Sequence, residues 1–152
     1  MRDRTTLLAY AQLGLLGWFV YGFGASLTLL RDDEGLTRTV AALLGVSLAV
    51  GGTLGSLMAA NVVRRWGRGA MLRAGSTLLA IGSLLYVSDG PFALIAMGPL
   101  LGSLGASFCA VGVSAYLEAR QGRAADAALA EANVVASIAS LVGTFAIGVG
   151  AV

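Results

Sequence analysis

The sequence predicts an all-α fold, a polytopic bundle of transmembrane helices, and three observations lead to this class. Hydrophobic residues make up 57% of the 152 residues and charged residues only 12%, well below the roughly 25% of a soluble domain. The mean hydropathy is +0.84. The few charges fall in short gaps between apolar runs that approach the ~20 residues a helix needs to cross a bilayer and lack the alternation typical of barrel strands.

Five transmembrane helices are expected, with boundaries set by the charges. The first, second, fourth and fifth apolar runs reach bilayer length on their own. The third, 74–88, has 15 uncharged residues and reaches that length only if the side chain of Arg73 extends toward the headgroups. Pro91 suits the start of a helix, where its missing N–H costs nothing. The chain is then one helical domain, with spans at approximately 7–30, 38–63, 70–88, 91–118 and 130–152.

The arginines predict how these helices are oriented. Numbering the gaps alternately from the N-terminus places two arginines, Arg31 and Arg38, on one side of the membrane and the other eight on the opposite side. Because arginine-rich loops stay in the cytoplasm, we expect a protein of the cell membrane (plasma or inner) with its N-terminus in the cytoplasm. An odd number of spans then places the C-terminus outside. The arginines expected in the cytoplasm are Arg2, Arg4, Arg64, Arg65, Arg68, Arg73, Arg120 and Arg123.

Small residues recur at intervals of four and predict close helix packing, because they let helix backbones approach in lipid. An Ala- and Gly-rich composition also produces some such spacings by chance. The sets are Ala41, Gly45 and Ala49; Gly51 and Gly55; Gly52, Ser56 and Ala60; Gly98, Gly102 and Ala106; and Ala139 and Gly143.

Missing residue types exclude several functions. The sequence has no His. This excludes a histidine general base, a histidine metal ligand and a catalytic triad that contains histidine. It has no Lys, which a phosphate-binding loop requires. Its single cysteine, Cys109, can form neither an intrachain disulfide nor a metal cage and is expected to be a small packing residue. We therefore expect no catalytic residues, no metal and no cofactor. The net charge of only +2 comes from arginines between apolar runs, so nucleic acid is not an expected partner.

One loop carries a motif. The stretch 60–69 reads Ala-Asn-Val-Val-Arg-Arg-Trp-Gly-Arg-Gly and connects the second and third expected spans. It resembles the loop signature of the major facilitator superfamily of transporters, G-x-L-x-D-R-x-G-R-[RK], because Arg65, Gly67 and Arg68 match its R-x-G-R part. Arg64 stands where the family has Asp and reverses that charge. The resemblance implies a gating loop at these four residues; the alternative is a basic turn that only sets topology.

A second stretch, 120–133, resembles the amphipathic link and Glu-Ala-Asn helix start of bacterial members of the superfamily. The family has twelve spans in two six-helix halves, so the resemblance covers about the first five. The resemblance implies that the chain corresponds to part of the family's N-terminal half and is incomplete relative to the family. The partners it implies are the lipid bilayer, a small-molecule substrate, and the missing remainder of the transporter or another membrane subunit.

The resemblance also implies a substrate path, because the first and fourth spans of the family line its central cavity. The uncharged polar residues of these two spans are the candidates: Gln12, Trp18, Tyr21, Ser103 and Ser107. Alternatively, the serines bond to their own helix and the aromatic residues anchor at the membrane interface. Ionisable residues near the spans are expected at the interfaces, as solvated or capping charges: Asp89, Glu118 and Glu131.

The sequence is compatible with two alternative functions. The first is transport of a small molecule by alternating access of the major facilitator type, in which helix bundles rock around a midplane site. The apolar path fits efflux of a hydrophobic compound, by this chain or by a longer protein of which it is a truncated fragment. The second is a small integral membrane protein that acts as a structural or assembly partner without transport.

Overall fold

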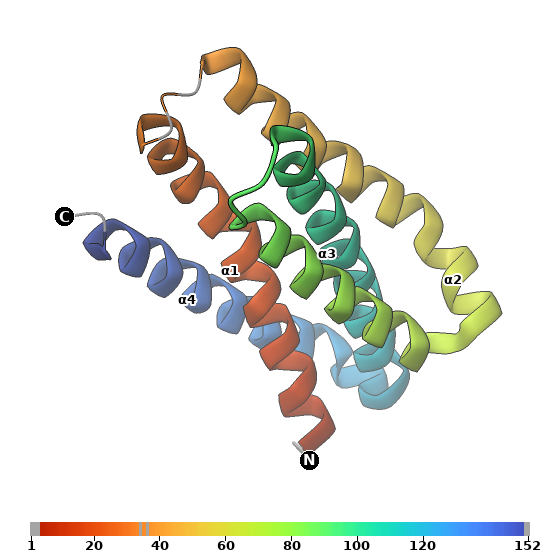
Figure 1. The fold of residues 1–152 in the computed structure, drawn as a ribbon. Helices are drawn as coiled ribbons and strands as arrows, with labels where there is room; N and C mark the ends of the chain where they lie inside the picture. Colours follow the sequence, from red (N-terminus) through yellow and green to blue (C-terminus); the bar gives the residue numbers. More distant parts are fainter. Residues whose placement is uncertain (1–3, 34, 36, 151–152) are drawn as a thin grey trace.

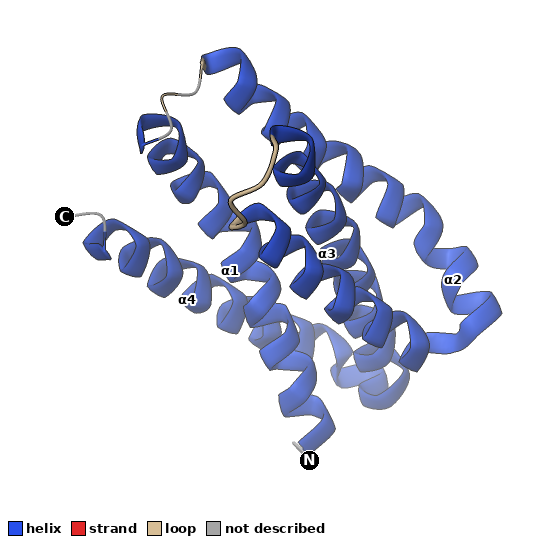
Figure 2. Cartoon of the chain, viewed as in Figure 1, coloured by secondary structure: helices blue, strands red, loops and turns tan. Residues whose placement is uncertain are grey.

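The structure is a computed structural model that describes residues 4–33, 35 and 37–150, and these residues form a bundle of helices (Figure 1). Figure 2 shows helices and short connections, with no strand in the described part. The elements in chain order are α1 (Arg4–Asp33), α2 (Arg38–Tyr86), α3 (Phe92–Gln121), the 3-10 turn η1 (Gly122–Ala124) and α4 (Ala125–Gly150).

The prediction of five transmembrane helices is wrong. Within the described ranges, three helical stretches are long and apolar enough to cross a membrane: Arg4–Arg31, Arg38–Tyr86 and Phe92–Val149. Two connections expected as loops are almost entirely helical, because the only interruptions there are the single non-helical residue Gly67 within α2 and the three-residue turn η1. The expected boundaries relied on charge, but arginine is a good helix former. A charged gap can therefore stay helical.

Gly67 turns α2 back on itself. Its backbone angles, φ 81° and ψ 166°, are not helical and lie in a region essentially restricted to glycine. The turn divides α2 into a first arm (38–66) and a second arm (68–86), and Figure 1 shows the chain reversing direction between them.

The two arms lie on either side of α3 and contact it through glycines. A Cβ atom on Gly55 of the first arm would lie 2.8 Å from the carbonyl oxygen of Leu104. One on Gly75 of the second arm would lie 2.9 Å from the carbonyl oxygen of Gly105. The close packing predicted from small residues is therefore confirmed for α2 against α3. It is wrong at Gly45, where a Cβ would meet nothing within 4 Å.

α1 and α4 form a second packed pair. A Cβ on Gly17 would lie 2.6 Å from the carbonyl oxygen of Ala136, and the indole of Trp18 lies against Gly143. The two pairs meet where α1 and α4 contact the end of α3. Buried residues from all three helices form a core there: Ala9, Tyr10, Leu13, Val113, Leu117, Ala128 and Ala132.

The ends of the bundle differ in charge. Figure 1 places the N-terminus, the bend of α2 and η1 at one end, and the C-terminus and the 87–91 connection at the other. Arginines adjoin all three features of the first end, and Arg38 begins α2 at the other end. Arg2, which contributed to the orientation prediction, lies outside the described residues, as do residues 151–152 of the expected fifth span.

Candidate functional site

A groove runs along the line where α1 meets the first arm of α2 and α3. Its volume is about 700 Å³, and we call it the serine groove. Ser103 and Ser107 of α3 line it together, as expected for residues four apart on one helix face. The remaining lining is mostly apolar and comprises Leu16, Val20, Leu48, Ala49, Gly52, Thr53, Ser56, Leu57, Ala106 and Ala110.

The hydroxyl groups of the serine groove donate to backbone carbonyls. Ser107 Oγ donates to the carbonyl oxygen of Gly52 at 2.9 Å, which joins α3 to the first arm. Ser103 Oγ donates to its own helix at Leu100, at 3.2 Å. Because these protons are used, the groove presents acceptor oxygens in apolar walls, and no ionisable side chain lines it. It suits an apolar molecule that carries few polar groups.

Gln12 lies outside the serine groove and connects α1 to the other helices. Its Nε2 donates to Ser76 Oγ at 2.6 Å, to the carbonyl oxygen of Leu72 at 3.3 Å and to Cys109 Sγ at 3.4 Å. Cys109 is buried, at 2% exposure. These hydrogen bonds connect α1 to α2 and α3, and they satisfy the donor groups of a polar side chain inside an apolar bundle.

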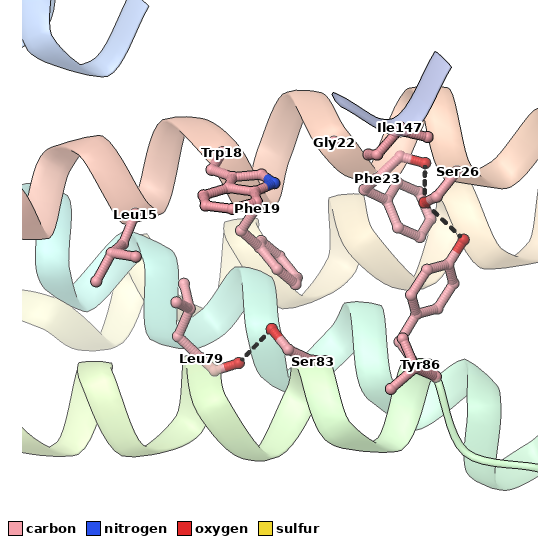
Figure 3. A pocket seen from close by; sticks show the side chains of 11 residues that line it. Leu15, Trp18, Phe19, Gly22, Phe23, Ser26, Leu79, Ser83, Tyr86 and Ile147 are labelled. Carbon is pink, nitrogen blue, oxygen red and sulfur yellow. Dashed lines mark hydrogen bonds between the residues drawn. The ribbon is translucent and has the colours of Figure 1, made fainter. Parts of the chain in front are cut away.

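Trp18 lines a second cavity, of about 400 Å³, between α1, the second arm and α4. Figure 3 shows this aromatic pocket, in which Trp18 and Phe19 project from α1; the indole of Trp18 lies against Gly143 of α4 and the ring of Phe19 against Gly102 of α3. At one end Ser26 Oγ donates to the carbonyl oxygen of Phe23 at 3.0 Å, so the hydroxyl of Tyr86, 3.2 Å away, is the donor to Ser26. The ring centroids of Phe23 and Tyr86 lie 5.1 Å apart.

The five candidate path residues therefore do not form one site. Ser103 and Ser107 share the serine groove, Trp18 lines the aromatic pocket, and Gln12 forms the tie between helices. Tyr21 is 64% exposed and lines neither cavity.

The four residues of the motif lie together at the bend of α2, and all four are exposed. Nη2 of Arg64 donates to Asn61 Oδ1 at 2.8 Å. Gly67 makes the turn itself, and Arg65 and Arg68 lie on its two sides. The charge reversal at Arg64 thus falls on an accessible side chain at the end of the bundle.

Sequence reasoning missed three polar groups. Glu131, expected as a charge at the interface, is half-buried and accepts a hydrogen bond from the hydroxyl of Tyr10 at 2.9 Å. The hydroxyl of Tyr116 is buried with no hydrogen-bond partner in the described part of the chain. The pair of Ser26 and Tyr86 was missed because the two residues lie 60 positions apart, and no local spacing relates them.

Among the described residues, no group of three or more Cys, Asp or Glu side chains is arranged to hold a metal ion. Comparison with protein-family models and with curated proteins gives no match. The resemblance to the major facilitator superfamily therefore depends on the motifs of the sequence alone.

Proposed function

We propose that the chain is a membrane protein that takes part in moving a small hydrophobic molecule across the bilayer by alternating access, as the resemblance to the major facilitator superfamily implies. The observation that carries the proposal is the serine groove. It has the apolar lining and sparse polar groups of a small-molecule site, and α1 and α3, which border it, correspond to the cavity-lining spans of the family.

The packing supports a movable groove. The glycine contacts that hold backbones close lie within the two pairs, α2 with α3 and α1 with α4. The serine groove lies between these pairs, where α1 contacts α3 through larger side chains such as Phe19, which packs against Gly102. Rocking of one helix unit against another is the motion that alternating access requires.

Within the part of the chain that the structure describes, three helical stretches are long and apolar enough to cross a membrane, which is compatible with a membrane location. The orientation belongs to the proposal. The arginine-rich end, with the bend of α2, lies in the cytoplasm and the C-terminus lies outside.

Cysteine accessibility tests the groove. In a Cys109→Ala background, Ser56→Cys places a thiol in the groove, and Leu141→Cys places a control on the outer face of α4, where Leu141 is 72% exposed. A membrane-impermeant thiosulfonate reagent is applied to the chain in native membranes. We expect the Ser56→Cys protein to react and the Leu141→Cys protein to stay unmodified, because a transport path admits water and a lipid-facing surface does not.

Equal protection of both thiols would mean that lipid or protein fills the groove, and it would overturn the transport proposal. Addition of a hydrophobic dye that the cell exports should slow the reaction at Ser56→Cys and leave a second control at the bend, Arg68→Cys, unchanged.

A second candidate function is that of an assembly partner, and α4 favours it. Its outer face presents large apolar side chains at helical spacing: Val134, Ile138, Leu141, Val142, Phe145 and Val149. Such a face suits lipid or another membrane subunit, including the remainder of a transporter. Cross-linking from Leu141→Cys to a specific membrane protein, together with a protected groove thiol, would support this function over transport.

A further inference from the structure

The bend of α2 gathers positive charge around one aromatic side chain. Arg64, Arg65 and Arg68 are exposed, and Trp66 between them is 69% exposed. Arg73 of the second arm is exposed as well. Residues 35–88, which include all of α2, contain no Asp or Glu, so α2 supplies no carboxylate to neutralise this charge.

The other described elements provide no ion-pair partner for these arginines at the bend either. Within the described part of the chain, neither Arg65 nor Arg68 has an ion-pair partner, and Arg64 bonds only to the neutral amide of Asn61. The bend also restricts where these groups lie, because Gly67 holds a tight turn and places arginines on both sides of it within five residues.

We propose that the bend of α2 is a binding site for the phosphate of anionic phospholipids. The guanidinium groups of Arg64, Arg65 and Arg68 contact the headgroup, and the indole of Trp66 lies among the headgroups. Guanidinium forks match phosphate oxygens in pairs, and tryptophan prefers the headgroup level of a bilayer. Apolar helix continues from both sides of the bend, and the bend would therefore lie at the level of the lipid headgroups.

The proposal is independent of transport, and it goes further than the rule that positive loops stay in the cytoplasm. That rule depends on the number of positive charges anywhere in a loop. A lipid site depends on guanidinium groups that lie close together at one position. The net charge of the headgroup should matter, because a zwitterionic lipid carries the same phosphate with a neutralising amine.

Tryptophan fluorescence provides the test. The chain has two tryptophans, so Trp18→Phe leaves Trp66 as the reporter. The protein is reconstituted into phosphatidylcholine vesicles containing the same small mole fraction of either brominated phosphatidylglycerol or brominated phosphatidylcholine. We expect brominated phosphatidylglycerol to quench Trp66 more strongly, by an amount that corresponds to a local enrichment of about fivefold for each arginine engaged.

Three variants locate the site. Arg64→Gln/Arg65→Gln should abolish the difference between the two brominated lipids, whereas Arg31→Gln/Arg38→Gln removes the same charge at the opposite end and should preserve it. Arg65→Lys keeps the charge without the guanidinium fork and should weaken the difference. Circular dichroism of each variant checks that the helices persist.

Equal quenching by the two lipids, or an unchanged preference in Arg64→Gln/Arg65→Gln, would overturn the proposal. Inorganic phosphate provides a further arm, compared with sodium chloride at equal ionic strength. If phosphate lowers the preference more than chloride does, the guanidinium groups recognise the phosphate itself, as proposed. An equal loss in both salts would mean that the preference comes from unspecific charge attraction, and it would overturn the assignment of a phosphate site.

Discussion

Gly82 shows how a single residue sets the distance between two helices. A Cβ atom at this position would overlap the backbone of Gly98 and Gly102 in α3, and a backbone cannot rotate away as a side chain can. Gly45, on the first arm, has open space instead. Close approach allows extensive van der Waals contact, the main attraction between helices in lipid.

Gly82→Ala should therefore destabilise the protein, because the second arm must move away from α3. We expect a loss of about 1–3 kcal/mol, typical of overpacking, measured as a lower midpoint of unfolding in detergent. Gly45→Ala adds the same methyl group and should leave the midpoint unchanged or slightly raised. Equal midpoints for the two variants would contradict the close contact at Gly82.

Gln12 ties α1 to the pair of α2 and α3 by hydrogen bonds, and Ser76 is its nearest partner, at 2.6 Å. A double-mutant cycle with Gln12→Leu and Ser76→Ala should give a coupling energy of about 0.6 kcal/mol, the average for hydrogen bonds between membrane helices. The measurement is reversible unfolding in mixed detergent micelles. Strictly additive effects would show that the hydrogen bond does not form.

At the scale of the element, α2 depends on Gly67. Its neighbourhood is open, since a Cβ there would meet nothing within 4 Å, so only the backbone conformation requires glycine. The sequence motif places a glycine at the turn, but it does not reveal that α2 continues as helix on both sides or that its arms enclose α3. Those features depend on the contacts of Gly55 and Gly75 with a helix that follows later in the chain.

Gly67→Ala should cost about 1–3 kcal/mol, the strain of a side chain in this backbone region. Gly69→Ala is the matched control, because Gly69 has equally open surroundings and its φ is not positive. Thermal unfolding of both variants should show a lower midpoint for Gly67→Ala alone. A fall of equal size in both variants would mean that the bend does not require the glycine conformation.

At the scale of the whole molecule, the two ends of the bundle carry different charge, and the termini lie at opposite ends (Figure 1). A bilayer with cytoplasmic arginines would orient such a molecule with the bend of α2 inside the cell. Because the termini lie at opposite ends of the bundle, the C-terminus is then expected outside the cell, as in the orientation predicted from the arginines.

An alkaline phosphatase fused after residue 150 should therefore be active, because this reporter needs the oxidising outside of the cell. The same reporter fused at the bend, after Arg68, should be inactive. Activity is compared at equal expression, with green fluorescent protein at both positions as the opposite reporter. A fluorescent, phosphatase-negative C-terminal fusion would contradict the orientation.

Part of the candidate site follows from helical spacing. Ser103 and Ser107 share one face of α3 because they are four residues apart, and they do line one groove. Gln12 and Trp18 lie on α1 and were expected on the same path, but they face different neighbours: Gln12 contacts Ser76, and Trp18 packs against Gly143. Spacing along α1 does not indicate which helix lies beside each of its faces.

Composition and hydropathy alone determined that the chain is helical and apolar and that its arginines gather near turns, because these properties depend on local residues and on the bilayer as solvent. The tertiary structure decided the number of helices, the enclosure of α3 by the two arms, and the separation of the candidate residues into distinct cavities. The reason is that lipid is as apolar as leucine, so hydropathy does not distinguish a face that packs on protein from one that contacts lipid. Only the fit of small residues such as Gly82 against another backbone makes that distinction.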